Sequence, residues 1–190
     1  MRIAIAYPPL KSEKGVALLT QNRQFQWFSR PTYIFPVVPA TAATMLKKAG
    51  HEVLFLDGIA SELSPEAFDA RLSEFRPDLV VLETKTPVVK RHWRWIESFR
   101  DKIGSNRVKI ESSKDGPNPT LPDSNPTLID PKFILVGDHV TALPEESIEK
   151  PGVWAVIPGG DWDFGLLDFL AAGCPKGVQP FALRDSTADA

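Results

Sequence analysis

The densest group of hydrogen-bonding side chains in this sequence follows an apolar segment at residues 132–136. The turn reads Gly137, Asp138, His139, Val140, Thr141, and Pro144-Glu145-Glu146 then begin a predicted helix. In an open α/β sheet, ligands bind at turns of this kind, outside the carboxyl ends of the strands. Glycines let a ligand approach the backbone, and hydroxyls with free turn amides bind its polar edges. If the preceding residues alternate between strands and helices, this turn lies on a ligand-binding edge.

Three other polar turns should share that edge, because each follows a predicted strand. They are Tyr7-Pro8-Pro9, Glu83-Thr84-Lys85-Thr86, and residues 158–163 with Gly159, Gly160 and Asp161. In any one turn, glycines that only form bends and threonines that only cap helices are as common as ligand contacts. Several polar turns on one edge favour a ligand.

His139 stands beside Asp138 and has three possible roles: a ligand, a proton carrier, or a turn residue that hydrogen-bonds its neighbours. The last is the commonest role for a single histidine. The sequence lacks the motifs G-x-G-x-x-G, G-x-x-x-x-G-K-[ST] and G-x-S-x-G, which disfavours nicotinamide cofactors, nucleotide hydrolysis and a catalytic serine. The single Cys174 excludes an intrachain disulfide, and without C-x-x-C or H-E-x-x-H spacing we expect any metal to arrive inside a cofactor.

Composition indicates one ordinary domain, since 190 residues with 43% apolar content can bury a substantial core. A net charge of -2 disfavours a nucleic-acid partner, and the basic cluster from Lys85 to Arg94, interleaved with Trp93 and Trp95, reads as a solvated helix face. No segment approaches the roughly 18 apolar residues of a membrane span. We therefore expect a cytoplasmic protein without membrane contact.

The positioning elements alternate along the chain. Strands are predicted at residues 2–6, 51–57, 78–82, 132–136 and 153–157; helices are predicted at 39–49, 65–75 with Ser64 as N-cap, 87–103 with Thr86 as cap, 144–149 and 164–172. Parallel neighbours need right-handed crossovers, so this order predicts a doubly wound, five-stranded parallel α/β sheet of flavodoxin-like order 2-1-3-4-5.

Two segments lack a clear period. Residues 10–33 read as a long loop with at most one irregular helix, and its aromatic residues Phe25, Trp27 and Phe28 either cover a ligand, contact a neighbouring domain or form a satellite cluster. Residues 104–131 carry five prolines and are predicted to be a flexible insertion. We predict one domain over residues 1–172, followed by a linker or tail over 173–190.

Three parts of the sequence together resemble the N-terminal cobalamin-binding domain of B12-dependent radical SAM enzymes. They are the turn 137–141 with Pro144-Glu145-Glu146, the segment 39–53 with Asp57, and Gly159-Gly160-Asp161. In that family the turn reads G-G-x-H-x-T followed by P-E-E. Here Asp138 immediately precedes His139, so the second glycine is missing or the spacing is one residue shorter.

The resemblance implies a corrinoid lying on the carboxyl edge of the sheet, with its nucleotide tail reaching into the domain. By matching position, the cofactor contacts would come from Tyr7, Pro8, Thr84, Thr86, Gly137, His139, Thr141, Gly159, Gly160 and Asp161. The cobalt-ligating signature D-x-H-x-x-G is absent, because Ala49, Lys90 and Gly137 stand two residues before the three histidines. We therefore expect no cobalt ligand and no catalytic residue from this chain, with His139 lining the pocket instead.

The resemblance also implies a partner. The radical SAM domain binds an iron-sulfur cluster through C-x-x-x-C-x-x-C and cleaves S-adenosylmethionine, whereas this sequence has only Cys174. The module would present its corrinoid to such a domain or subunit for methyl transfer or radical chemistry. Two rivals remain: a flavodoxin-like domain that binds a flavin or nucleotide, and a non-catalytic interaction domain.

Overall fold

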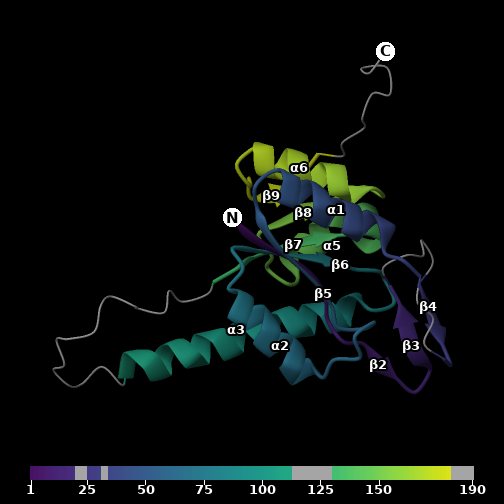
Figure 1. Ribbon diagram of the computed structural model, residues 1–190, viewed down its shortest axis with the longest axis horizontal. Helices are drawn as coiled ribbons and strands as arrows, with labels where there is room; N and C mark the ends of the chain where they lie inside the picture. Colours follow the sequence, from purple (N-terminus) through teal and green to yellow (C-terminus); the bar gives the residue numbers. More distant parts are fainter. Residues whose placement is uncertain (20–24, 31–33, 113–129, 181–190) are drawn as a thin grey trace, which may run out of the picture.

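The computed structural model describes residues 1–19, 25–30, 34–112 and 130–180, with side chains within the long helix described as far as Gly104. Its centre is a six-stranded parallel sheet in the order β5-β1-β6-β7-β8-β9 (Figure 1). The strands of this sheet are β1 (Arg2–Tyr7), β5 (Glu52–Asp57), β6 (Leu79–Glu83), β7 (Lys132–Val136), β8 (Ala155–Ile157) and β9 (Gly177–Val178). The fold is therefore a Rossmann-like α/β fold.

The first five of these strands have the order predicted from the sequence, 2-1-3-4-5, and all neighbouring pairs are parallel. The prediction of five strands was wrong by one, because β9 adds an edge strand beside β8. With two residues, Gly177 and Val178, it is too short to show a period in sequence. β9 lies within the predicted linker or tail, so the sheet continues past residue 172; residues 181–190 lie outside the described part.

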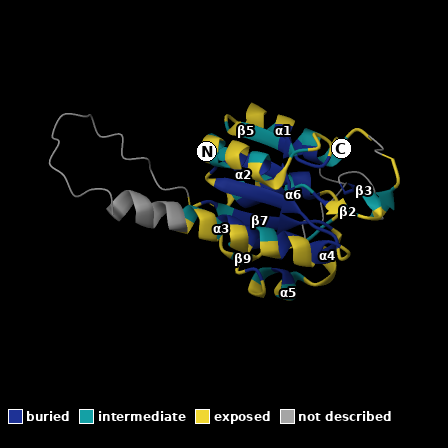
Figure 2. Cartoon of the chain, turned by 90° about the horizontal axis from the view of Figure 1, so that it is seen from below, coloured by how far each residue is buried: buried dark blue, intermediate teal, exposed yellow. Residues whose placement is uncertain are grey.

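The central strands are apolar on both faces because helices cover both sides of the sheet (Figure 2). Every residue of β6 is buried, as are all residues of β1 and β7 after the first. Side chains therefore alternate between two cores. One core includes Ile3, Ile5, Val81 and Ile134, and the other includes Ala4, Val80, Leu82 and Phe133.

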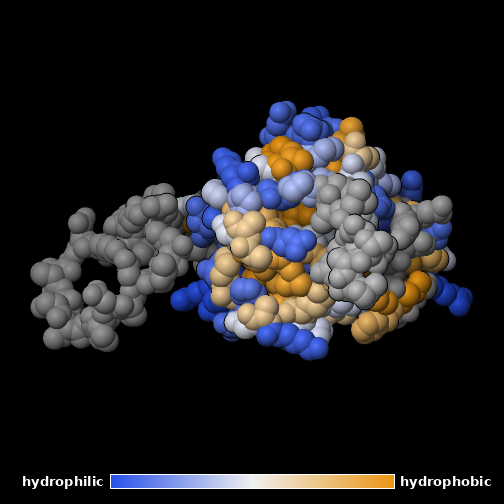
Figure 3. Space-filling model, turned by 90° about the horizontal axis from the view of Figure 1, so that it is seen from above, coloured by the Kyte–Doolittle hydropathy of each residue, from blue (hydrophilic) through white to orange (hydrophobic). Residues whose placement is uncertain are grey.

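Each core is closed by its own helices. On the first face lie α1 (Val37–Lys48) and α6 (Trp162–Ala171), which bury Leu46, Leu166 and Phe169 against the sheet. On the second lie α2 (Pro65–Phe75) and α3 (Val89–Ser112), which contribute Phe68 and Phe99. Figure 3 shows the side of the molecule that carries α1 and α6, with apolar patches between charged side chains.

Residues 10–33 are predicted as a loop with at most one irregular helix, but the described residues among them form a small antiparallel sheet. Its strands are β2 (Lys11–Ser12), β3 (Gly15–Leu18) and β4 (Gln26–Phe28). Strands of two to four residues show no alternation that a sequence pattern could reveal. Ala17 and Leu19 belong to the same core as Tyr7, and Trp27 packs against that core. Phe25 and Trp27, which meet edge-on, therefore pack against the core of the main sheet.

The helix boundaries follow local chemistry. Ser64 caps α2 as predicted, because its Oγ accepts a hydrogen bond of 3.1 Å from the Ala67 amide. The predicted Thr86 cap was wrong: α3 begins at Val89, after a turn, and it continues past the predicted end near residue 103 to Ser112. The rest of the predicted Pro-rich insertion, residues 113–129, lies outside the described residues. α4 (Asp138–Ala142) precedes the predicted helix α5 (Pro144–Glu149).

None of the helices in the described part combines the length and the apolar character that crossing a membrane requires.

Candidate functional site

The sheet has a topological switch point between β1 and β6. The chain leaves β1 for β5 on one side and then crosses to β6 on the other, so the loops after β1 and β6 diverge. Tyr7 and Glu83 are the last residues of these two strands, and the Tyr7 hydroxyl donates a 2.7 Å hydrogen bond to Glu83 Oε2. Both side chains are buried, so the floor of the switch point is polar and closed to water.

Glu83 also belongs to a short chain of charges. Lys85 Nζ lies 3.8 Å from Glu83 Oε1 and 3.0 Å from Asp138 Oδ2, which joins the loops after β6 and β7. Burial raises the pKa of Glu83, while the hydrogen bond from Tyr7 and the charge of Lys85 oppose that rise. Burial, followed by the negative charge of Glu83, raises the pKa of Tyr7 well above its ordinary value. Charge is thus concentrated beneath the carboxyl edge.

Glu83 and Lys85 are not among the predicted contact residues, although the sequence contained a signal for them. Glu83 follows the run Leu79–Leu82 directly and Lys85 stands two residues later, and ionisable residues at the end of a fully apolar strand are unusual enough to indicate a site. The sequence predicts a solvated helix face for Lys85. The structure corrects this, because its side chain is only 6% exposed.

Gly137 packs the loop after β7 directly onto the loop after β6. Its backbone has φ 103° and ψ −172°, a region that essentially only glycine occupies. A Cβ here would lie 2.7 Å from the Thr84 carbonyl oxygen and 3.0 Å from Glu83 Cγ. The Thr84 amide donates to Val136 O at 2.8 Å, and its buried hydroxyl lies 2.9 Å from His92 Nδ1. Glycine is therefore required for this contact between the loops.

His139 lies against α3. Its side chain is buried, its Nδ1 lies 3.1 Å from the Thr86 hydroxyl, and its ring meets Trp93 edge-on at 5.9 Å between centroids. Nε2 is buried and has no hydrogen-bond partner among the described residues. Burial lowers the pKa of His139, which favours the neutral ring. Of the three roles that the sequence allowed for His139, this geometry matches a turn residue that hydrogen-bonds its neighbours.

Thr141 connects the loop after β7 to the loop after β8. Its hydroxyl donates to Gly137 O at 3.0 Å and accepts from the Gly159 amide at 2.9 Å. Gly160 and Asp161 follow and are exposed, and no atom lies within 4 Å of a Cβ position at Gly160. The backbone at this end of the edge is therefore open to a ligand.

Hydrogen bonds and packing connect all four loops: Tyr7 bonds to Glu83, Gly137 packs on Thr84, and Thr141 bonds to Gly159.

The predicted contact residues differ in their exposure to solvent. The buried members are Tyr7, Pro8, Thr84, Gly137 and His139; Gly159 is half-buried, and the exposed members are Thr86, Thr141, Gly160 and Asp161. Direct contact with a ligand surface is available to the exposed group, while the buried group supports it.

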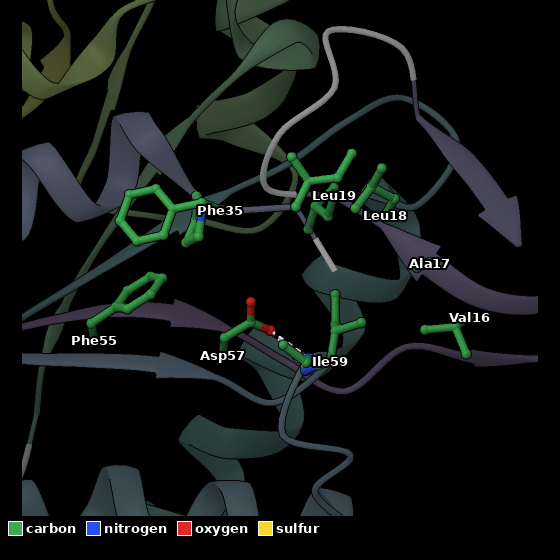
Figure 4. Close-up of a pocket in the computed structure, with 11 residues that line it drawn as sticks. Val16, Ala17, Leu18, Leu19, Phe35, Phe55, Asp57 and Ile59 are labelled. Carbon is green, nitrogen blue, oxygen red and sulfur yellow. Dashed lines mark hydrogen bonds between the residues drawn. The ribbon is translucent and has the colours of Figure 1, made fainter. Parts of the chain in front are cut away.

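An apolar cavity of about 420 Å³ lies at the carboxyl end of β5, beside this edge (Figure 4). None of its lining residues belongs to the predicted set: Val16, Ala17, Leu18, Leu19, Ile34, Phe35, Pro36, Phe55, Asp57, Ile59 and Ala60. Asp57 supplies its only charge among the described residues. One carboxylate oxygen accepts from the amides of Ile59 at 3.0 Å and Ala60 at 2.9 Å, and burial raises the pKa of Asp57.

No protein-family model matches the chain, and no curated protein matches it. Among solved structures, the chain is similar to the radical S-adenosylmethionine methyltransferase TsrM from Kitasatospora setae, with cobalamin and a 4Fe-4S cluster bound. The TM-score is 0.49 at 16% sequence identity, over 90% of this chain and 24% of that chain. This chain thus spans about a quarter of that enzyme's length.

Proposed function

We propose that this chain is a cobalamin-binding module that holds a corrinoid at the carboxyl edge of β1, β6, β7 and β8. The observation that carries the proposal is the turn Gly137–Thr141. Its sequence resembles the corrinoid-binding turn of B12-dependent radical SAM enzymes, and it joins the loops after β6 and β8 into one platform. A doubly wound sheet binds its ligand at this edge.

The exposed residues fit the chemistry of a corrinoid. A corrin ring is broad and carries amide side chains around its rim, so it needs an open surface with donors and acceptors. Asp161 offers a carboxylate there, and the hydroxyl oxygens of Thr86 and Thr141 keep acceptor capacity beside their bonds to His139, Gly137 and Gly159. The open backbone at Gly160 allows close approach. The 420 Å³ cavity is too small for a corrin ring, but its size and apolar lining suit an aromatic group such as the base of a nucleotide tail.

The residues present indicate what this chain contributes and what the cofactor and a partner would contribute. Bound cobalamin supplies the cobalt chemistry, and this chain binds and orients it. Among the described residues, no group of three or more His, Cys, Asp or Glu side chains could hold a metal ion. The three cysteines of a radical SAM cluster are absent from the sequence, so a partner domain or subunit would supply that cluster and S-adenosylmethionine. Methyl transfer or radical chemistry would take place between the two.

Equilibrium dialysis of the purified chain against hydroxocobalamin and methylcobalamin tests the proposal, with corrin absorbance as the readout. We expect retention at one corrinoid per chain. Gly160→Phe should weaken binding at least about tenfold, because the ring would occupy open space at the edge and displace the ligand. Ala172→Phe is the matched control: this exposed residue ends α6, away from the loops of the site, and should leave the affinity unchanged.

The same dialysis with flavin mononucleotide tests the principal rival. A folded chain that retains the flavin and no corrinoid would replace the proposal with a flavodoxin-like function. A folded chain that retains neither would favour the interaction domain. If Gly160→Phe and Ala172→Phe both weakened corrinoid binding to the same extent, that result would contradict the placement of the ligand at this edge.

A further inference from the structure

A second cavity, of about 540 Å³, lies between the loop after β1 and the helices α2 and α3. It is on the sheet face opposite α1 and α6. Its lining is Pro8, Pro9, Leu10, Lys11, Pro65, Asp69, Arg91, His92, Arg94, Trp95, Ser98 and Lys102. We call this the basic groove, because four of these side chains are cationic and one is a carboxylate.

Three of the four cations lie on one side of α3, and Lys11 comes from β2. Arg91, Trp95, Ser98 and Lys102 recur at the spacing that places side chains on one helix face, with Arg94 beside them. The acidic residues Glu97 and Asp101 of the same helix do not line the groove.

The single carboxylate of the groove is already paired. Asp69 Oδ2 accepts from Lys102 Nζ, and its other oxygen accepts from Trp95 Nε1 at 2.9 Å. Arg91 donates one hydrogen bond, of 2.8 Å, to the Lys11 carbonyl oxygen and stacks on Trp27, and a guanidinium has further N–H groups to offer. Positive charge from Lys11, Arg91 and Arg94 therefore exceeds what the groove's own carboxylate can balance.

His92 lines the same groove and is 1% exposed. Its Nδ1 lies 2.9 Å from the Thr84 hydroxyl, and its Nε2 is buried without a hydrogen-bond partner among the described residues. Burial, followed by the charge of Arg91, lowers the pKa of His92 to about 3, so the ring is neutral. If Thr84 donates to Nδ1, then Nε2 carries the proton and becomes a buried donor without an acceptor. Such a donor is costly to leave unpaired.

We propose that the basic groove binds the phosphate group of a small phosphorylated molecule. Arg91 and Arg94 supply charge-assisted hydrogen bonds to the phosphate oxygens, and the neutral His92 ring forms part of the lining beside them. The organic part lies along Trp95 and the prolines of the loop after β1. The cations of this groove are not among the predicted corrinoid contacts, although Pro8 belongs to both sets.

The test titrates the chain, free of cobalamin, with ribose 5-phosphate and inorganic phosphate at constant ionic strength. Long-range ¹H–¹⁵N spectra of the histidine rings should show the Nε2–H tautomer for His92 and a shift of its signals on binding. Ribose 5-phosphate should bind more tightly than inorganic phosphate and change tryptophan fluorescence.

Two charge variants on α3 make the test specific. Arg94→Ala should weaken binding about tenfold, the loss expected for one charge-assisted contact. Lys90→Ala removes the same charge from an exposed position of the same helix that does not line the groove, and should leave the affinity unchanged. Equal weakening by both would indicate diffuse attraction and overturn the proposal. So would a His92 signal that moves no more with phosphate than with chloride, or equal affinity for the two phosphates.

Discussion

At the scale of single residues, the carboxyl edge depends on contacts between loops that are far apart in sequence. Tyr7 meets Glu83, and Gly137 meets Thr84. The sequence shows that polar residues and a glycine stand at these strand ends. It does not show which of them contact each other, because each partner follows or ends a different strand. Two predictions concern these residues.

Gly137→Ala should lower the free energy of unfolding by at least about 2 kcal/mol, since the backbone conformation is unfavourable for alanine and the Cβ would press on the Thr84 carbonyl. Urea denaturation measures the change. Gly160→Ala is the control, because its Cβ meets no atom within 4 Å, and its stability should stay within about 0.5 kcal/mol of the wild type. Equal stability of the two variants would contradict the role assigned to Gly137.

Tyr7 should make the fold sensitive to alkali. Its pKa is raised in the folded state by burial and by Glu83, so the unfolded chain releases this proton first as the pH rises through about 10. The stability contributed by the neutral phenol is complete below that pH and is lost above it.

Tyr7→Phe should lower the free energy of unfolding by about 1–3 kcal/mol at neutral pH, because Glu83 loses a hydrogen bond. This difference between the wild type and the variant should become smaller between about pH 9 and 11. Urea midpoints across this range provide the measurement. A difference in unfolding free energy that stays constant with pH would contradict this role of Tyr7. Any titration of the other tyrosine is common to both proteins and cancels.

At the scale of elements, the sequence predicts the segments that carry a hydrophobic period or a continuous apolar run. The longer helices and the buried strands have periods or apolar runs that local reasoning detects, and Ser64 as the cap of α2 follows from its residue type and position. The short strands β2, β3, β4 and β9 carry no such period. They form because neighbouring strands offer backbone hydrogen bonds, which is tertiary information.

The small sheet should unfold locally without loss of the main sheet. Gly15 has φ 108°, and a Cβ there would overlap the Phe28 carbonyl oxygen across the β3–β4 pair. In Gly15→Ala, amide hydrogen exchange should speed up for Val16 to Leu18, while amides of β1 and β6 keep their protection. Equal acceleration in both sheets would show instead that they unfold as one unit.

At the scale of the whole molecule, two cores share one sheet, so they should unfold together. Leu46→Ala empties part of the core under α1, and Phe99→Ala empties part of the core under α3. We expect losses of about 2–5 and 3–5 kcal/mol, each with a single transition that coincides by fluorescence and circular dichroism. Two separate transitions in either variant would show that the faces unfold independently.

The sequence by itself determined the alternation of strands and helices, the order of the first five strands of the main sheet, and the edge on which the polar loops gather. These follow from hydrophobic period, crossover handedness and the shared direction of parallel strands. Tertiary structure decided which polar residues are buried and which face solvent. It placed Glu83 and Lys85 beneath the edge, turned His139 toward Trp93, and left Gly160 open. The physical reason is that burial and hydrogen-bond partners belong to pairs of residues from different loops, whereas a sequence pattern reports only one segment at a time.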